Sequence, residues 1–305
     1  MANYQIKNDG QIELIKENSF KLEKEIQILT EQNLNLIFGL DFIKSEFSLN
    51  GFRIDTLAFD RNVSAFVIIE YKRDKNFSVI DQGYAYLSLM LNNKADFILE
   101  NNECSKQTLK KNDVDWSQSR VLFISPSFTT YQIEAINFKD LPIELWEVKR
   151  YSNQTVNYSQ IKTRGSQESI KTISRDDQIV ETVNKEIKVY TEEEHSISTS
   201  PEILELYGML KNAIMNLDGI ELKPTKKYLA FVGNSNIVDV HIQKKALKIW
   251  INLSKGELDD PKNLARDVFG IGHWGNGDYE LQIQDDGNID YIMSLIKQSY
   301  KKNKK

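Results

Sequence analysis

Three short apolar or alternating segments follow one another between residues 42 and 72, and this succession limits the fold more than any other feature of the chain. They read "FIKSEFSL" (42–49), "RIDTLAFD" (53–60) and "AFVIIEYK" (65–72). The pair Asn50-Gly51 and the polar turn "DRNVS" separate them. Runs of this kind, joined by short turns, are typical of consecutive antiparallel strands. The sequence therefore predicts a three-stranded meander.

A helix is predicted on each side of this meander. Apolar residues recur near helical spacing from about Phe20 to Ile37, which predicts one N-terminal helix. Ser78 and Asp81 form a capping-box pattern at the start of "VIDQGYAYLSLML", which predicts a second helix. Further apolar runs, "ADFILE", "SRVLFIS" and "IELWEVKRY", alternate with a short helix predicted at 131–137. We expect these runs to add strands to the same sheet, which gives an α/β domain of order αβββα with further strands.

The chain becomes polar and poor in aromatic residues from Ser159 to about Lys188. This composition predicts a linker at residues 159–187, between a first domain at 1–158 and a second domain at 188–305. In the second domain Ser200-Pro201 opens a predicted helix, and three strand-like runs follow it. A helix near residues 261–269, the strand "DYELQIQ" and a closing helix complete this predicted small α+β domain.

Charge and cysteine content narrow the function. The net charge is −5, with 18 Lys and Arg against 22 Asp and Glu in residues 1–150 and 21 against 22 in the rest. Neither half binds nucleic acid by summed positive charge, so phosphate binding needs local patches or a bound cation. The single cysteine, Cys104, excludes internal disulfides. The longest apolar runs are far shorter than the roughly 20 residues of a membrane span, so we expect a cytoplasmic protein with no membrane partner.

Pairing of the second and third strands would bring two acidic residues together. If Asp60 faces Ala65 across the four-residue turn, Phe59 faces Phe66 and Asp55 faces Glu70. The two-residue period of a strand then puts Lys72 on the same side of the sheet as both carboxylates. A register slip of one residue would turn Asp55 to the opposite face, so the prediction depends on this pairing.

Two carboxylates this close repel each other, and the pKa of one of them rises unless a positive group lies between them. A divalent cation meets this requirement, and hard oxygen ligands favour Mg²⁺ or Mn²⁺ bound by Asp55 and Glu70. Such a cation lowers the pKa of a bound water and stabilises negative charge on a phosphate. Lys72 is placed to orient that water or to offset charge in the transition state. The pattern is typical of phosphodiester hydrolysis.

Two further residues are candidates for the same site, and a simpler interpretation of Asp55, Glu70 and Lys72 has to be weighed. Gln82 and Tyr86 are four residues apart on the second helix and share a face, so both can hydrogen-bond near the carboxylates. The simpler interpretation is a solvated sheet edge that carries a cross-strand ion pair. The apolar residues that precede Glu70 argue against it, because they predict a central strand.

The order Asp55, Glu70-Tyr71-Lys72 and Gln82-Gly83-Tyr84-Ala85-Tyr86 resembles the PD-(D/E)XK nuclease superfamily, including the QxxxY helix motif of some members. More closely, "RIDTLAFD", "VIIEYKR", "VIDQGYAYL" and "DVDWSQSRVLFIS" resemble bacterial proteins related to the NucS-type endonucleases. Those proteins often carry a C-terminal module of the DUF5655 type. "VYTEEEH", "KPTKKYLAFV" and "DYIMSLIKQSY" are similar to that module. The resemblance covers most of the chain except the predicted linker.

The resemblance implies a restriction-endonuclease-like αβββαβ mixed-sheet domain and a Mg²⁺- or Mn²⁺-dependent deoxyribonuclease. Asp55 and Glu70 would bind the metal, Lys72 would be the catalytic lysine, and Gln82 with Tyr86 would assist. Family members often add a glutamate from the first helix. Glu23 fits that role best by its distance from Asp55, with Glu31 and Glu25 as competitors. Ile54 stands where proline would precede the aspartate, at a position that tolerates variation.

A second hypothesis is a non-catalytic nucleic-acid-binding or adaptor protein that keeps the nuclease fold and uses its C-terminal module to bind a partner. The net negative charge and the module, to which no chemistry is assigned, motivate it. The sequence leaves open the form of the nucleic acid, although DNA is favoured. It also leaves open whether the chain forms a homodimer, as related nucleases do to cut both strands.

Overall fold

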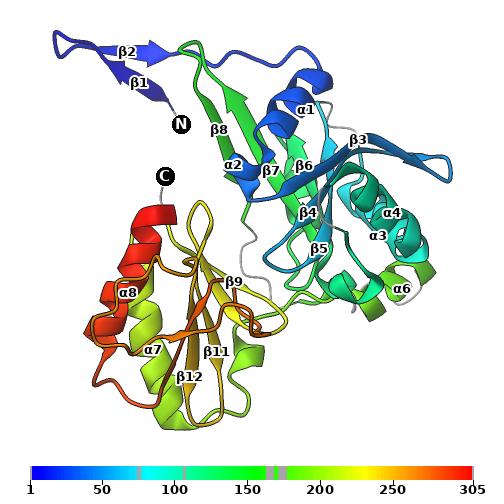
Figure 1. Cartoon of the computed structure of the whole chain (residues 1–305). Helices are drawn as coiled ribbons and strands as arrows, with labels where there is room; N and C mark the ends of the chain where they lie inside the picture. The colour runs from blue at the N-terminus through cyan, green and yellow to red at the C-terminus, as the bar shows by residue number, and fades with distance from the viewer. Residues whose placement is uncertain (1, 74–76, 106–107, 163–167, 171–176, 304–305) are drawn as a thin grey trace. The chain divides into compact units, whose positions relative to one another are not determined.

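A computed structural model of the chain describes residues 2–73, 77–105, 108–162, 168–170 and 177–303. The chain divides into two compact units, Met1–Val189 and Tyr190–Lys305. Each unit has its own six-stranded sheet and its own apolar core (Figure 1).

The sheet of the first unit is mixed, and its strands lie in sequence order. The strands are β3 (Asp41–Leu49), β4 (Phe52–Asp60), β5 (Ala65–Tyr71), β6 (Arg120–Ser125), β7 (Ile143–Arg150) and β8 (Val156–Gln160). β3, β4 and β5 form the predicted antiparallel meander, whereas β5, β6 and β7 run parallel and β8 returns antiparallel. The predicted α/β class with a mixed sheet is therefore confirmed.

The predicted register of the β4–β5 hairpin is also confirmed. Asp60 pairs with Ala65, and Phe59 pairs with Phe66. The rings of these two phenylalanines meet edge to face at 5.3 Å, which contributes to holding the register.

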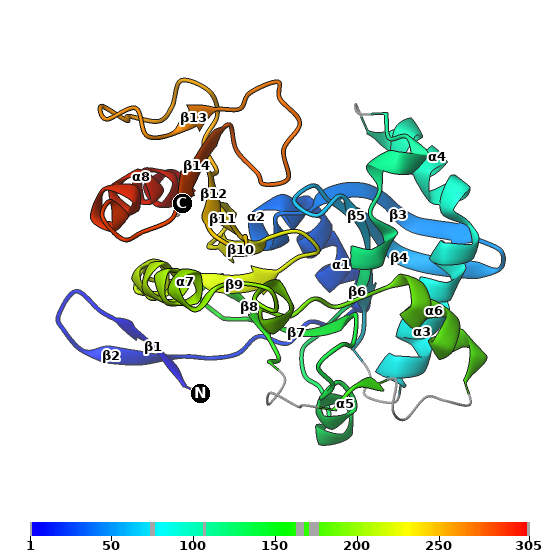
Figure 2. The ribbon, with the colours of Figure 1, turned by 90° about the horizontal axis from the view of Figure 1, so that it is seen from below.

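Helices cover both faces of this sheet. They are α1 (Glu23–Gln32), α2 (Leu34–Phe38), α3 (Val79–Asn92), α4 (Lys94–Cys104), α5 (Thr130–Ala135) and α6 (Gln178–Glu186), with short 3₁₀ helices at Lys111–Asp113 and Trp116–Gln118. Figure 2 shows α1 and α2 on one face, and α3, α4 and α6 on the other. Each face has its own buried cluster, with Ile26 of α1 in one and Leu87 of α3 in the other. Figures 1 and 2 also show the hairpin of β1 (Asn3–Ile6) and β2 (Ile12–Ile15), which was not predicted.

Two predicted elements of this unit were wrong. The single helix from Phe20 to Ile37 is two helices, because Asn33 between them leaves helical geometry at ψ 18° and its side chain bonds the Leu29 carbonyl. The run "ADFILE" belongs to α4 and not to a strand. Phe97 of this helix is fully buried against Phe47 and Phe66. The short apolar run therefore forms the buried face of a helix and not a strand.

The predicted linker at 159–187 contains part of the first unit's core. Residues 163–167 and 171–176 lie outside the described chain, but α6 is a nine-residue helix capped by Asp177. Val180 and Val183 of α6 join the buried cluster that contains α3, and Tyr84 donates a hydrogen bond to Asn184 at 2.9 Å. This segment looked like a linker because only two of the helix's nine residues are buried.

The second unit is an antiparallel sheet with two helices on one face (Figure 1). It contains a 3₁₀ helix at Glu193–His195, α7 (Pro201–Met215), β9 (Glu221–Pro224), β10 (Leu229–Val232), β11 (Asn236–Ile242), β12 (Leu247–Ile251), β13 (Arg266–Asp267), β14 (Tyr279–Ile283) and α8 (Ile289–Asn303). Ser200 caps α7 as predicted. The helix predicted near 261–269 is absent from this described stretch, which holds turns and the short β13.

None of the described helices is both long enough and apolar enough to cross a bilayer.

Candidate active site

The β4–β5 hairpin places Asp55 across from Glu70. Thr56 pairs with Ile69, so the next position on each strand brings the two acidic residues opposite each other. β5 lies between β4 and β6, and all seven of its residues are buried. The Glu70 residue is only 4% exposed. The carboxylates therefore do not lie on a solvated sheet edge.

One oxygen of the Glu70 carboxylate has two donors, and the other has none. Glu70 Oε1 accepts hydrogen bonds from Lys72 Nζ at 2.8 Å and from Gln82 Nε2 at 3.0 Å. Glu70 Oε2 is buried and has no hydrogen-bond partner among the described residues. A buried carboxylate oxygen without a partner carries a substantial desolvation cost, so it is a place where a bound cation or water would be favoured.

Helix α3 brings Gln82 and Tyr86 to the same carboxylate. Gln82 Nε2 also donates to the Tyr86 hydroxyl at 3.1 Å, and that hydroxyl donates to the Arg53 carbonyl at 3.2 Å. Burial and the charge of Glu70 raise the pKa of Tyr86 above its ordinary value, so the phenol stays protonated and able to donate. Five of the six site residues predicted from the sequence thus lie together around Glu70.

A glycine in α3 sets how closely the helix approaches the sheet. A Cβ on Gly83 would lie 2.5 Å from Cδ1 of Ile143 on β7. Only glycine therefore fits this contact without movement of its neighbour, and the close approach lets the adjacent Gln82 reach Glu70.

The environment of Asp55 opposes its ionisation. Burial, and next the charge of Glu70, raise the pKa of Asp55 from 3.8 to about 6. The backbone N–H of Tyr71 donates to Asp55 Oδ2 at 3.0 Å, and this bond, with the charge of Lys72, acts in the opposite direction. Two carboxylates with one lysine beside them leave an excess of negative charge that a cation would balance.

Gln27 of α1 was not predicted as part of the site, yet it anchors the strand that carries Asp55. Its side chain is buried and donates from Nε2 to the Asp55 carbonyl at 2.9 Å, to Ser45 Oγ at 3.1 Å and to Glu31 Oε1 at 3.0 Å. A polar residue beside Ile26, on the buried side of a helix, was the available signal.

Glu46 was also missed. It lies between the pairs Ser45–Thr56 and Phe47–Ile54, and therefore across from Asp55 on the other side of β4. The two-residue turn at Asn50-Gly51 fixes this register, so the sequence held the information. Lys24 at 2.9 Å and Arg53 at 3.0 Å pair with Glu46, and its charge makes a small contribution to the raised pKa of Asp55.

The three glutamates considered from the first helix each have another partner. Glu23 accepts the backbone N–H of Arg73 at 2.7 Å, which places it beside the end of β5. Glu25 pairs with Arg150 at 3.2 Å, and Glu31 accepts the Thr56 hydroxyl at 2.6 Å. The part of the chain that is described holds no group of three His, Cys, Asp or Glu side chains arranged to bind a metal ion. A role for Glu23 as a third ligand stays a prediction.

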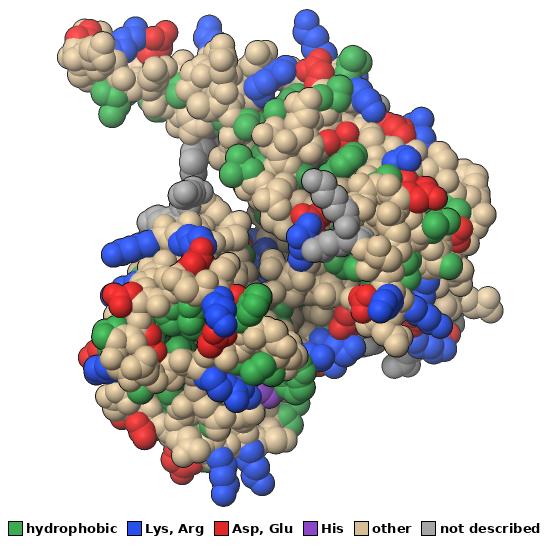
Figure 3. Space-filling view, viewed as in Figure 1, with side chains coloured by type: hydrophobic (Ala, Val, Ile, Leu, Met, Phe, Trp, Pro, Cys, Tyr) green, Lys and Arg blue, Asp and Glu red, His purple; other side chains and the backbone are tan. Residues whose placement is uncertain are grey.

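Asp55 and Glu70 nevertheless fit a hard divalent cation. Both offer carboxylate oxygens, and Glu70 Oε2 has no partner within the described structure. Mg²⁺ commonly binds through one or two protein carboxylates, with waters and substrate phosphate oxygens as its other ligands. On the face seen in Figure 3, acidic and basic side chains are interspersed over both units, so charge for a phosphate has to be supplied locally.

Comparison with solved structures gives low similarity. A structure described as an EndoMS–dsDNA2 complex matches 48% of this chain and 65% of its own chain, at 14% identity and a TM-score of 0.28. A repair endonuclease from Pyrococcus abyssi matches 48% of this chain and 64% of its own, also at 14% identity, with a TM-score of 0.24. The chain thus spans less than two thirds of each, and at these scores the likeness does not define its fold.

Comparison with sequences is more informative. The family described as "Domain of unknown function (DUF5655)" matches residues 193–303, so the predicted DUF5655-type module is present in the second unit. An uncharacterized protein of Haemophilus influenzae (strain ATCC 51907 / DSM 11121 / KW20 / Rd) is 55% identical over 293 residues, which cover 96% of this chain and 97% of that protein. The chain therefore belongs to the same family as this Haemophilus influenzae protein.

Proposed function

We propose that the first unit is a PD-(D/E)XK-type nuclease that hydrolyses DNA phosphodiester bonds with Mg²⁺ or Mn²⁺. The observation that carries the proposal is the arrangement of Asp55, Glu70 and Lys72. The half-buried Asp55 faces the buried Glu70, one oxygen of Glu70 lacks a partner in the described structure, and a lysine donates at 2.8 Å. The choice of DNA rests on the resemblance of the sequence motifs to nucleases.

Each residue has a role that its position supports. Asp55 and Glu70 would hold the cation, which supplies a water of lowered pKa and positive charge toward the phosphate. Lys72 orients the attacking water and offsets charge on the phosphate. Gln82 fixes the rotamer of Glu70, and Tyr86 holds Gln82 in turn through its hydroxyl. Because the pKa of Asp55 is about 6, its carboxylate is ionised at neutral pH and available as a ligand.

Cleavage assays with matched variants test the proposal. Purified full-length chain is incubated with single-stranded and duplex DNA in Mn²⁺, Mg²⁺ or EDTA. Asp55→Asn and Lys72→Met should each lower the cleavage rate by roughly 10²-fold or more. The control variants Asp96→Asn and Lys44→Met change the same residue types at exposed positions of the same unit and should cut as the wild type does. Equal cutting by all five proteins, or no cutting of any DNA by the wild type, would exclude the proposal.

Metal binding is tested without cleavage. At a concentration ten times the Kd, a cation that binds only the folded state stabilises it by about 1.4 kcal/mol. Mn²⁺ should therefore raise the Tm of the wild type and of Asp96→Asn, whereas Asp55→Asn should show little change. A similar rise in all three would place the cation elsewhere.

A non-catalytic nucleic-acid-binding or adaptor protein is the second candidate. The observation that favours it is the ion pair of Lys72 and Glu70, since a pair that satisfies its own charge has a structural role without a metal. Under this hypothesis Glu70→Ala still binds nucleic acid or a protein partner in EDTA. Loss of all binding on removal of the metal would contradict it.

A further inference from the structure

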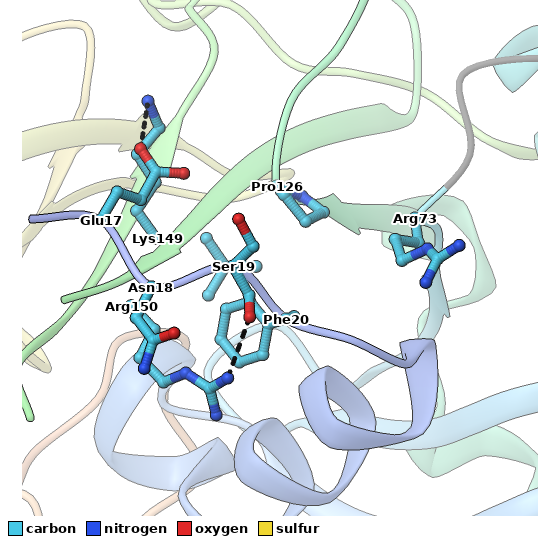
Figure 4. Close-up of a pocket in the computed structure, with 9 residues that line it drawn as sticks. Glu17, Asn18, Ser19, Phe20, Arg73, Pro126, Lys149 and Arg150 are labelled. Atoms are coloured by element: carbon cyan, nitrogen blue, oxygen red, sulfur yellow. Dashed lines mark hydrogen bonds and ion pairs between the residues drawn. The ribbon is translucent and has the colours of Figure 1, made fainter. Parts of the chain in front are cut away.

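A cavity of about 140 Å³ lies in the first unit, next to the candidate site along the chain. Figure 4 shows Arg73 and Pro126 on one side, Lys149 and Arg150 on the other, and Ser19 with Phe20 between them. Arg73 directly follows Lys72, so their Cα atoms are about 3.8 Å apart. None of the lining residues is among the five that meet at Glu70.

The sheet explains why these residues converge. β5, β6 and β7 run parallel, so their carboxyl ends lie side by side at the same end of the sheet. Arg73 comes just after β5, Pro126 just after β6, and Lys149 with Arg150 ends β7. Ligands of α/β sheets commonly bind beyond the carboxyl ends of parallel strands. The remaining wall comes from residues 17–20, which are tied to β7 by a bridge between Glu17 and Tyr151 and by a bond from Asn18 N to the Arg150 carbonyl.

The cavity is positively charged. Three of its lining residues are cationic, and only Glu17 is acidic. Glu17 approaches Lys149 at 3.7 Å, which is a loose ion pair, as Figure 4 shows. The Arg73 guanidinium bonds the Lys21 carbonyl and pairs with no carboxylate of the described residues. In a unit with a net negative charge, this is a local basic patch of the kind that phosphate binding requires.

Arg150 is held rigidly, with one donor unused. Its guanidinium lies over the Phe20 ring at 4.6 Å and donates to the Ser19 carbonyl at 3.1 Å and to Glu25 at 3.2 Å. Its Nε is buried and has no hydrogen-bond partner in the part of the chain that the structure describes. The side chains of Asn18 and Ser19 likewise make no hydrogen bond with any described residue. The cavity therefore offers several donors that a ligand rich in oxygen would satisfy.

We propose that this cavity binds a phosphate group of a nucleic-acid strand, close to the phosphodiester at the candidate active site. Arginine forks match the oxygens of a phosphate, and Lys149 adds a compact charge. Arg73, which follows Lys72 in the chain, connects the two places, because Lys72 bonds Glu70 and Arg73 lines the cavity. The inference rests on the proposed function for its substrate, because the same cavity chemistry would also hold free phosphate or a mononucleotide.

Binding of a labelled oligonucleotide to the full-length protein in EDTA tests the proposal without cleavage. The variant Arg73→Gln/Lys149→Gln removes two cations from the cavity. The control Lys44→Gln/Arg61→Gln removes two cations of the same unit that pair with Glu100 and Asp41. We expect the cavity variant to bind roughly tenfold weaker or more, since each hydrogen bond to a charged group contributes about that factor. The control should bind as the wild type does.

Salt dependence identifies the lost contact as one with phosphate. The slope of log K against log salt should shrink by about 0.7 to 0.9 for each phosphate contact removed. The conservative variant Arg73→Lys/Lys149→Arg, which keeps both charges, should retain the slope. Lys149→Gln alone guards against misfolding of the double variant, because the Lys149 side chain is 38% exposed and has one loose ion pair. Equal affinity and equal slope in cavity and control variants would overturn the proposal.

Two further comparisons are needed. One distinguishes the phosphate of a nucleic-acid strand from free phosphate, and the other distinguishes failure of the cavity proposal from failure of the nuclease proposal. If inorganic phosphate or a deoxynucleoside monophosphate raises the Tm of the wild type but not of the cavity variant, while oligonucleotide affinity is equal in both, the ligand is a free phosphate and the strand proposal fails. If the wild type cuts DNA but the cavity variant binds like the control, only the cavity proposal fails. If the wild type never cuts but the cavity variant loses affinity, the cavity proposal stands without the nuclease.

Discussion

The burial of Asp55 across from Glu70 makes the stability of the first unit depend on pH. The fold raises the pKa of Asp55 from 3.8 to about 6, so the folded state favours the protonated acid. The stabilisation is complete below about pH 4 and is lost as the pH rises through 6. The loss should be roughly 1–2 kcal/mol, allowing for partial solvent screening of this carboxyl.

Denaturation by urea in EDTA at pH 4, 5, 6 and 7 checks this prediction. Asp55→Asn lacks the titrating group. Its free energy of unfolding, relative to that of the wild type, should therefore increase from pH 4 to pH 7. Two curves that stay parallel would show that Asp55 does not carry the effect. The same variant should be at least as stable as the wild type at pH 7, although we expect it to cleave DNA far more slowly, because sites of function often cost stability.

Gln27 is expected to act through the position of Asp55. Gln27→Met keeps the volume but leaves the partly buried Asp55 carbonyl without this donor, which should cost about 1–3 kcal/mol of unfolding free energy. Gln32→Met is the matched control, since Gln32 is exposed on the same helix. Urea denaturation compares the two. A cost at Gln27 no larger than at Gln32 would contradict the role of this hydrogen bond.

At the scale of helices and strands, the features predicted correctly are those that depend on neighbouring residues in the sequence, such as turns and the alternation of a strand. The β4–β5 register followed from the turn and from alternation, and it brought Asp55 to Glu70. The assignment of "ADFILE" to a strand was wrong because the run shows apolar character but not which partner it packs on. Gln27 and Glu46 were missed because their roles depend on tertiary contacts between α1, β3 and β4. Glu23 was chosen by chain distance, which does not determine where a side chain points.

The contact of α3 with β7 is a prediction at this scale. Alanine normally stabilises a helix relative to glycine by up to about 1 kcal/mol. Gly83→Ala should instead destabilise by about 1–3 kcal/mol and slow cleavage, because its Cβ would meet Ile143 Cδ1 at 2.5 Å.

The double variant Gly83→Ala/Ile143→Val tests the cause of that effect. Valine lacks Cδ1, so the double variant should recover stability and cleavage relative to Gly83→Ala. Thermal unfolding and cleavage rates of the wild type, both single variants and the double variant form a complete cycle. Purely additive costs would mean that the two residues do not interact.

At the scale of the whole molecule, the chain divides into two units because each has its own apolar core. The position of α6 determines where the boundary between the units lies. The buried clusters of the first unit include Val180 and Val183 of α6, whereas those of the second unit begin at Ile203. The polar composition of 159–187 predicted a boundary at 158, because composition does not show that two valines and Asn184 complete the packing against α3.

A comparison of two truncations decides between these boundaries. The piece 1–189 should unfold cooperatively with a Tm close to that of the first unit within the full chain, since it keeps every buried residue of its core. The piece 1–158 lacks α6 and the last two residues of β8, so it exposes the surface that α6 covers and its Tm should be lower by several degrees. Calorimetry of both pieces and the full chain measures this.

In the piece 1–189, Val183→Asp should lower the Tm toward that of 1–158, whereas Glu181→Ala, at an exposed position of the same helix, should leave it unchanged. Equal stability of the two truncations would show that α6 does not stabilise the first unit and that residues 159–187 act as a linker.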